Sequence, residues 1–130
     1  MSCSPGAIRV FIADDSALIR DRVAAMLGES ACTVVGHGDT PQACIGGILA
    51  ERPDVVVLDV QLEGGTGLEV LKAVRAASPG VAFVVFSNSS GPAYRKRYLA
   101  QGATRFLDKS EEFEQLPHAV AAASHRVAAP

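Results

Sequence analysis

Short apolar runs alternate along the chain with longer segments in which apolar residues recur every three or four positions. The short runs are rich in Val, Ile and Phe and have the length of strands. They predict strands at 8–13, 33–36, 55–58, 81–86 and 104–107. Because the run at 55–58 is continuously apolar, we expect it to form a central strand that is buried on both faces of a parallel sheet.

Residues that start or stop helices bracket the segments between these strands. Ser16 and the Thr40–Pro41 pair are typical of helix starts, and Gly28 and Gly102 are typical of helix ends. The predicted helices cover about 17–27, 41–51, 68–77, 92–101 and 117–127, the last after a looser turn at 111–116. Gly46 and Gly47 weaken the second helix by about 1 kcal/mol each relative to Ala.

Five strands that alternate with five helices through short loops predict a doubly wound α/β domain. Its five-stranded parallel sheet has right-handed crossovers and helices on both faces. The length of 130 residues suits one compact domain, which we expect to span residues 1–130 with no output domain.

Charge and cysteine content exclude several other classes of protein. The 12 basic and 14 acidic residues nearly balance, which argues against direct nucleic-acid binding. No apolar stretch is long enough to span a membrane, and no export signal is evident. Cys3, Cys32 and Cys44 have no metal-site spacing, and their odd number fits a reducing, cytoplasmic location.

Polar residues follow the predicted strands at the edge where parallel sheets bind ligands. They are Asp14, Asp15, Asp59, Ser87, Asn88, Asp108 and Lys109. A cluster of carboxylates is stable when a hard divalent cation neutralises it, and Mg²⁺ is the candidate because few protein oxygens are on offer. The lysine and the serine in turn need an anion, and a phosphoryl group meets both demands.

These residues resemble those of the receiver domain of two-component response regulators, and the resemblance covers essentially the whole chain. The family's acidic pair corresponds to Asp14 and Asp15, its phosphoacceptor to Asp59, its hydroxyl residue to Ser87 and its lysine to Lys109. The family's switch aromatic, three residues before that lysine, corresponds to Phe106. The resemblance implies the flavodoxin-like (βα)5 receiver fold.

The resemblance also implies a mechanism. Asp59 would take a phosphoryl group from a histidine kinase or phosphotransfer protein, with slow self-dephosphorylation. Asp15, Asp59 and the Gln61 carbonyl would hold Mg²⁺, with Asp14 acting mostly through water, and Lys109 would pair with the phosphoryl group. Ser87 and Phe106 would then move and switch a surface that binds an unknown downstream protein. The protein would be a signalling module rather than an enzyme.

Several positions depart from the family's commonest pattern. Asn88 stands where Ala or Gly is usual and either narrows access to Asp59 or hydrogen-bonds the phosphoryl group. Glu63 and Ser110 stand where proline is frequent. Gln61 and Ser89 lie where the family tunes the lifetime of the phosphoryl group.

Three readings of function remain open from the sequence. The first is a stand-alone receiver whose basic stretch 94–98, with the last strand and helix, forms a docking surface or a homodimer interface. The second is a metal-dependent phosphohydrolase with an aspartyl nucleophile, which usually has a second aspartate where this chain has Gln61. The third is an adaptor that works without phosphorylation.

Overall fold

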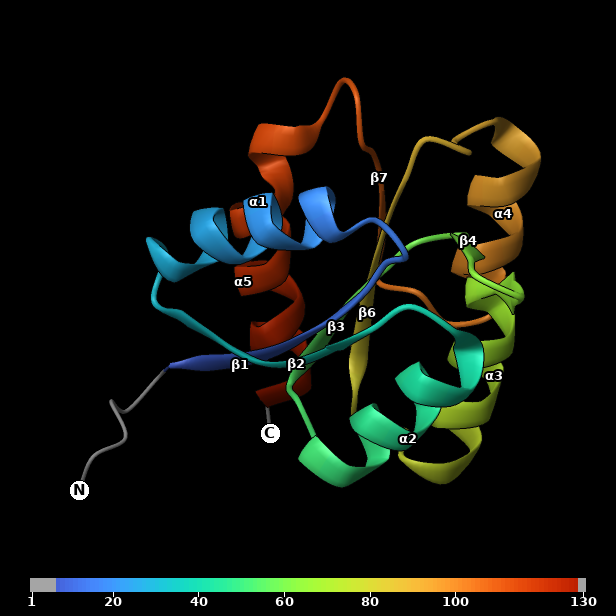
Figure 1. Cartoon of the computed structure of the whole chain (residues 1–130), viewed down its shortest axis with the longest axis horizontal. Coiled ribbons are helices and arrows are strands. Elements are labelled where there is room, and N and C mark those ends of the chain that lie inside the picture. Colours follow the sequence, from blue (N-terminus) through green and yellow to red (C-terminus); the bar gives the residue numbers. More distant parts are fainter. Residues whose placement is uncertain (1–6, 129–130) are drawn as a thin grey trace.

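Five parallel strands form the central sheet of the computed structural model, which describes residues 7–128 (Figure 1). The strands are β1 (Ile8–Ala13), β2 (Cys32–Gly38), β3 (Val55–Leu58), β6 (Ala82–Ser87) and β7 (Arg105–Asp108). Their spatial order is β2-β1-β3-β6-β7, and every neighbouring pair is parallel. The order reverses between β1 and β3, which confirms the doubly wound fold and marks where a ligand site is expected.

Helices cover both faces of this sheet. They are α1 (Ala17–Gly28), α2 (Pro41–Glu51), α3 (Gly67–Ala77), α4 (Pro92–Ala100) and α5 (Leu116–Ala128), with a 3-10 turn, η1 (Phe113–Gln115), before α5. One half of the core packs α1 and α5 against the sheet, and the other half packs α2, α3 and α4. Figure 1 shows the two helical layers on either side of the strands.

Alternation along the strands separates the two halves of the core. In β1, Val10 and Ile12 belong to the half under α1 and α5, whereas Phe11 and Ala13 belong to the half under α2 to α4. All four are at most 1% exposed. Because both faces of the strand are buried, the sequence reads as an unbroken apolar run rather than an alternating one.

The segment between β3 and α3, for which the sequence predicted neither a strand nor a helix, is regular. It forms a two-stranded antiparallel hairpin of β4 (Gln61–Leu62) and β5 (Gly65–Thr66). Gly64 has a φ of 78°, a conformation that favours glycine at the tip of such a turn. The hairpin carries the chain from the end of the central strand to the start of α3.

Gly47 has a packing role that its helix propensity does not reveal. A Cβ atom at this position would lie 2.7 Å from Cε2 and 2.9 Å from Cζ of Phe11. The absence of a side chain therefore lets α2 approach the ring of Phe11 in the centre of the sheet. A Cβ atom on Gly46, one position earlier, would have nothing within 4 Å. Of the two glycines, only Gly47 is therefore needed for the close packing of α2 against Phe11.

Two further sequence expectations concern membranes and cysteines. Among residues 7–128, no helix combines the length and the apolar character that a membrane crossing requires. Cys32 and Cys44 are free and buried, and burial raises the pKa of the Cys44 thiol to about 12. Cys3 lies outside the described residues.

The strand β1 begins and the helix α5 ends at the same edge of the sheet (Figure 1). The loops that follow the carboxyl ends of the strands lie at the opposite edge. The polar residues singled out in the sequence therefore share an edge that is remote from the start of β1 and the end of α5.

Candidate functional site

Lys109 connects two carboxylates that come from different strands. Its Nζ atom lies 2.7 Å from Oδ2 of Asp14 and 2.9 Å from Oδ2 of Asp59. The three side chains are between 4% and 10% exposed. The topology explains the contact, because β1 and β3 are neighbours and Lys109 directly follows β7 at the same edge.

The turn from β1 into α1 holds Asp14 and Asp15 in different environments. Oδ1 of Asp14 accepts a hydrogen bond from the Ser16 amide at 2.9 Å, and its carbonyl oxygen accepts one from Arg20 at 2.7 Å. Ser16 caps α1 by accepting from the Ile19 amide at 3.2 Å. Asp14 is consequently held inside at 3% exposure, whereas Asp15 is exposed.

The backbone around Asp59 depends on Gly67, the first residue of α3. A Cβ atom on Gly67 would lie 2.1 Å from the carbonyl oxygen of Asp59, so no larger residue fits this position. The Gly67 amide donates to the Val60 carbonyl at 2.7 Å, and the Val60 amide donates to Oδ1 of Asp59 at 2.7 Å. The first residue of α3 therefore supports the backbone of Asp59 directly.

Burial and the neighbouring opposite charges have opposing effects on the pKa values of Asp14 and Lys109. Burial raises the pKa of Asp14, and the hydrogen bond from Lys109 only partly offsets that rise. Burial also disfavours the charged form of Lys109, but the hydrogen bonds to Asp14 and Asp59 outweigh it and raise the pKa of the ammonium group. The lysine therefore stays charged and acts as the internal counter-ion of the two carboxylates.

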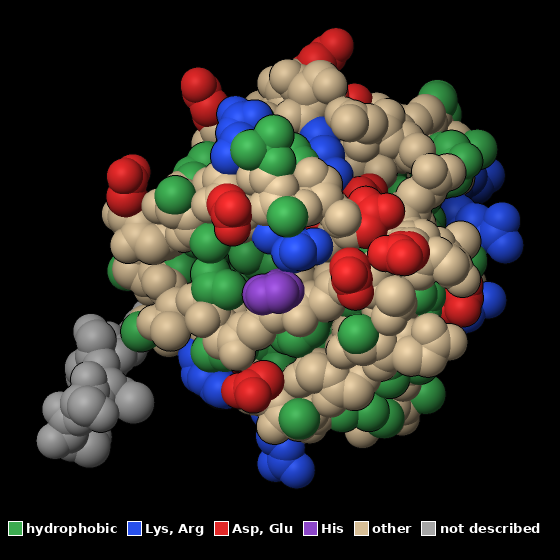
Figure 2. Space-filling model, viewed as in Figure 1, with side chains coloured by type: hydrophobic (Ala, Val, Ile, Leu, Met, Phe, Trp, Pro, Cys, Tyr) green, Lys and Arg blue, Asp and Glu red, His purple; other side chains and the backbone are tan. Residues whose placement is uncertain are grey.

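The donor atoms of the cluster suit a divalent cation. Asp14, Asp15 and Asp59 each offer a carboxylate oxygen, and these oxygens all lie within 4.8 Å of one another. With Lys109 charged, the ionised cluster keeps two net negative charges, which match one divalent ion. In the space-filling view, acidic side chains gather where β1 ends and α1 begins (Figure 2). An all-oxygen site with few protein ligands favours Mg²⁺.

A pocket of about 320 Å³ opens onto the cluster. It is lined by Asp15, Ser16, Ile19, Asp59, Gln61, Ser87, Asn88, Ser89 and Lys109. The structure thus brings together the residues that the sequence predicted at the strand ends. Asp14 is not among the lining residues, so an incoming group meets Asp59 beside Lys109, whereas Asp14 lies behind them. Asp108 faces elsewhere and bonds the Ser110 and Glu111 amides.

The two residues expected to switch are both buried. Ser87 is 1% exposed, and its Oγ accepts a hydrogen bond from the Ser89 amide at 3.1 Å. Phe106 is 4% exposed and packs edge-on against Tyr98, with ring centres 6.0 Å apart. The structure therefore holds the Phe106 ring in an inward, buried position.

Arg95 of the basic stretch is bound within the chain. Its guanidinium donates to the carbonyl oxygens of Ser90 and Phe106, each at 3.0 Å, and pairs with Glu112 at 3.1 Å. The Asp108 amide donates to the same Glu112 oxygen at 2.8 Å. This amide bond, followed by the contact with Arg95, lowers the pKa of Glu112. Lys96 and Arg97 remain exposed on α4.

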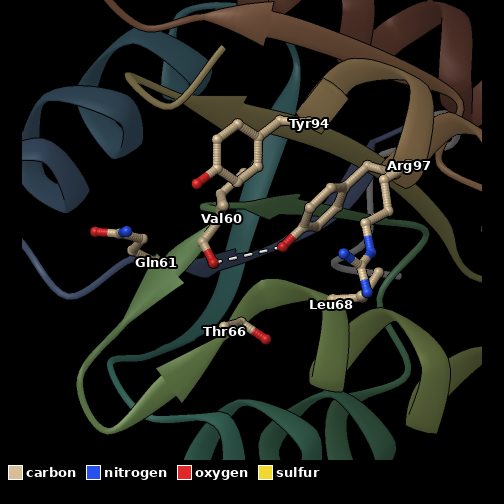
Figure 3. Close-up of a pocket in the computed structure, with 7 residues that line it drawn as sticks. Val60, Gln61, Thr66, Leu68, Tyr94 and Arg97 are labelled. Atoms are coloured by element: carbon tan, nitrogen blue, oxygen red, sulfur yellow. Dashed lines mark hydrogen bonds between the residues drawn. The ribbon is translucent and has the colours of Figure 1, made fainter. Parts of the chain in front are cut away.

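A second pocket of about 230 Å³ lies between the β4–β5 hairpin and α4 (Figure 3). Its walls are Val60, Gln61, Thr66, Leu68, Tyr94, Arg97 and Tyr98. The Tyr98 hydroxyl reaches the Val60 carbonyl at 3.5 Å, and burial raises the pKa of Tyr98 to about 12. Gln61 lines both pockets, so the two sites are neighbours.

An open parallel sheet with an acidic pocket and a buried lysine at its carboxyl edge defines a doubly wound α/β protein with a candidate ligand site at that edge. The family model of the response regulator receiver domain matches residues 10–121. The chain belongs to this family. Receiver domains of this family accept a phosphoryl group on an aspartate and bind Mg²⁺ at an acidic pocket.

Similar proteins include two transcriptional regulators. The chain is 28% identical over 114 residues to the transcriptional regulatory protein DesR of Bacillus subtilis, a match that covers 87% of the chain and 56% of DesR. It is 34% identical over 117 residues to the probable transcriptional regulatory protein NarL of Mycobacterium tuberculosis, covering 89% of the chain and 54% of NarL. The chain thus spans about half the length of these curated relatives.

Solved structures agree with this assignment. The signal receiver domain of NarL from Mycobacterium tuberculosis matches with a TM-score of 0.84 and 33% identity, covering 90% of this chain and 95% of that domain. The receiver domain of a LuxO-like repressor from Vibrio parahaemolyticus matches with a TM-score of 0.85 at 20% identity, covering 92% of each chain, and shares the fold.

Proposed function

We propose that Asp59 accepts a phosphoryl group from the phosphohistidine of a histidine kinase or phosphotransfer protein. The observation that carries this proposal is the position of Asp59 in the pocket wall beside Lys109, with Asp14 held behind them. Lys109 supplies a fixed positive charge at the point where phosphoryl oxygens would lie. Ser87 and Asn88, which line the same pocket, add a hydroxyl and an amide.

The proposed step exchanges one bond at phosphorus for another. A carboxylate oxygen of Asp59 attacks phosphorus roughly in line with the phosphorus–nitrogen bond, which breaks, and the bonding electron pair leaves with the imidazole. Asp15, Asp59 and the Gln61 carbonyl would hold Mg²⁺, with Asp14 mostly through water. The ion would neutralise charge on the transferring group. Lys109 keeps the phosphoryl oxygens aligned through its ammonium group.

The output would be a change in the surface around α4, β7 and α5. Ser87 would turn from the Ser89 amide toward the phosphoryl group, and the space that it leaves would let the Phe106 ring occupy an inward position such as the buried one described above. We propose a downstream protein or a second copy of the chain as the partner of this surface, with Lys96, Arg97 and the half-exposed Tyr94 as its exposed residues. The buried, free Cys32 and Cys44 fit the reducing cytoplasm.

The experiment that tests the proposal is intact-mass measurement after incubation with Mg²⁺ and acetyl phosphate. The wild type should gain one phosphoryl group, Asp59→Asn should gain none, and Asp21→Asn, an exposed carboxylate on α1, should behave as the wild type. Continuous turnover of phosphate esters would instead support the phosphohydrolase. Partner binding by Asp59→Asn at wild-type strength would support the adaptor.

A further inference from the structure

A hydrogen bond joins the two loops above the phosphorylation pocket. The Ser110 hydroxyl donates to Oδ1 of Asn88 at 3.0 Å, across 22 positions of sequence. Asn88 follows β6 and Ser110 lies two residues after β7, so the bond spans the gap between the ends of two neighbouring strands. Both side chains are exposed, so the bond lies at the rim of the site rather than in its floor.

Two depressions of similar size adjoin this pair. One is the phosphorylation pocket of about 320 Å³, and the other is a hollow of about 290 Å³ whose wall includes Arg22, Ser110 and Phe113. Ile19, Asn88 and Lys109 line both hollows. The bond to Ser110 therefore fixes the Asn88 side chain, which belongs to the wall of both hollows.

Two backbone hydrogen bonds to Asp108 fix the turn that carries Ser110. Its amide donates to Oδ1 of Asp108 at 2.8 Å, and the Glu111 amide donates to the same oxygen at 3.0 Å. This turn keeps the Ser110 backbone in place when its hydroxyl is removed. The change of Ser110 to Ala therefore isolates the contact with Asn88.

We propose that the Ser110–Asn88 bond acts as a strap across the pocket mouth that selects phosphodonors by the size of their leaving group. The inference rests on the proposed phosphorylation of Asp59. In an in-line transfer the leaving group points away from Asp59, toward the mouth, where the strap narrows the space. Ser110 is a positioning residue because it acts through Asn88. A bulky imidazole leaving group is hindered more than ammonia.

The test compares phosphoimidazole with phosphoramidate as donors, using the full chain with Mg²⁺ and intact mass as the readout. Ser110→Ala and Asn88→Ala should each raise the phosphoimidazole rate relative to the phosphoramidate rate by about two- to ten-fold, the range expected from one hydrogen bond. The double variant should show no further rise, because the two residues act as one unit. Ser110→Thr keeps the hydroxyl and should keep the wild-type ratio.

Glu111→Ala, a change at an exposed neighbour, is the control and should leave the ratio unchanged. An unchanged ratio in Ser110→Ala overturns the strap, even if Asn88→Ala changes it, because Asn88 then acts alone. Additive effects in the double variant overturn it as well. If the wild type takes no phosphoryl group from either donor, the proposed function itself fails. If the wild type is phosphorylated and all variants have the same ratio of phosphoimidazole to phosphoramidate rates, the strap is overturned but the proposed function stands.

Discussion

The guanidinium of Arg95 lies 5.2 Å from the centre of the Phe106 ring and covers it from the side of α4. The same group donates to the Phe106 carbonyl, so one side chain holds both the ring and the backbone of this residue. Tyr98, one helical turn further along α4, contacts the ring edge-on. Two residues of α4 therefore hold the Phe106 ring in its inward position.

Removing the Arg95 side chain should loosen α4 from the end of β7. We expect Arg95→Ala to lower the free energy of unfolding by about 1 kcal/mol, or the Tm by a few degrees, because a partly exposed ion pair and its hydrogen bonds are lost. Lys96→Ala, at an exposed cation of the same helix, is the control and should change the Tm little. Thermal unfolding by circular dichroism measures both.

The ion pair between Arg95 and Glu112 should make the Tm difference between the wild type and Arg95→Ala depend on pH. The pKa of Glu112 is lowered in the folded protein, so its stabilising contribution is present above the ordinary value of 4.5 and is lost as the pH falls through the lower folded value. The gap in Tm between the wild type and Arg95→Ala should therefore narrow on acidification below 4.5, while the hydrogen bonds of Arg95 to the Ser90 and Phe106 carbonyls keep part of it. A gap that stays constant would mean that Glu112 contributes nothing to it.

Lys109 should compete with Mg²⁺ for the same carboxylates. Lys109→Met leaves Asp14 and Asp59 without their counter-ion, which we expect to cost about 3–5 kcal/mol, as when a buried ion pair is broken. Mg²⁺ should restore part of this loss, so its addition should raise the Tm of Lys109→Met more than that of the wild type. Lys72→Met, at an exposed lysine of α3, controls for the loss of a positive charge. Equal shifts in all three proteins would contradict the competition.

Protons should weaken Mg²⁺ binding through Asp14. Because burial raises the pKa of Asp14, this carboxyl takes up a proton at a higher pH than an ordinary aspartate with its value of 3.8. The dissociation constant for Mg²⁺ should therefore begin to rise before the solution reaches that pH. Titration calorimetry at falling pH measures it, and Asp14→Asn should bind more weakly with a flatter pH profile. An equally steep profile in Asp14→Asn would assign the effect to another group.

Two adjacent glycines of α2 should respond in opposite directions to the same change. Gly46→Ala should stabilise the protein by up to about 1 kcal/mol, because the new methyl group meets open space and the helix propensity improves. Gly47→Ala should destabilise it by about 1–3 kcal/mol, because the methyl group would collide with the Phe11 ring. Urea unfolding of the two variants tests the difference, and stabilisation by both changes would show that Phe11 yields without cost.

The strands and helices were predictable because each has a signal in its own residues. Unbroken apolar runs indicated the strands, and the Ser16 and Thr40 caps lie where the structure has them. The β4–β5 hairpin was missed because strands of two residues are too short to show a period. Gly28 was expected to end α1 but is its last residue, since the backbone N–H of Glu29 makes the terminal bonds.

The candidate site was predictable as a set of residues but not in its contacts. A parallel sheet brings all strand ends to one edge, so Asp14, Asp59 and Lys109 were expected together. The need for Gly67 was not visible, because its close approach to the Asp59 carbonyl arises only when α3 packs against the end of β3. Nor was the pairing of Arg95, whose partner Glu112 lies 17 residues away along the chain.

The path of the chain through the fold has a practical consequence for studying it. β1 begins and α5 ends at the edge of the sheet opposite the carboxylate pocket (Figure 1). A dye, an affinity handle or a reporter attached at the start of β1 or at the end of α5 is therefore on the far side of the molecule from Asp59. Tethering the protein to a sensor surface through these positions leaves the pocket facing solution, where donors and binding partners have free access.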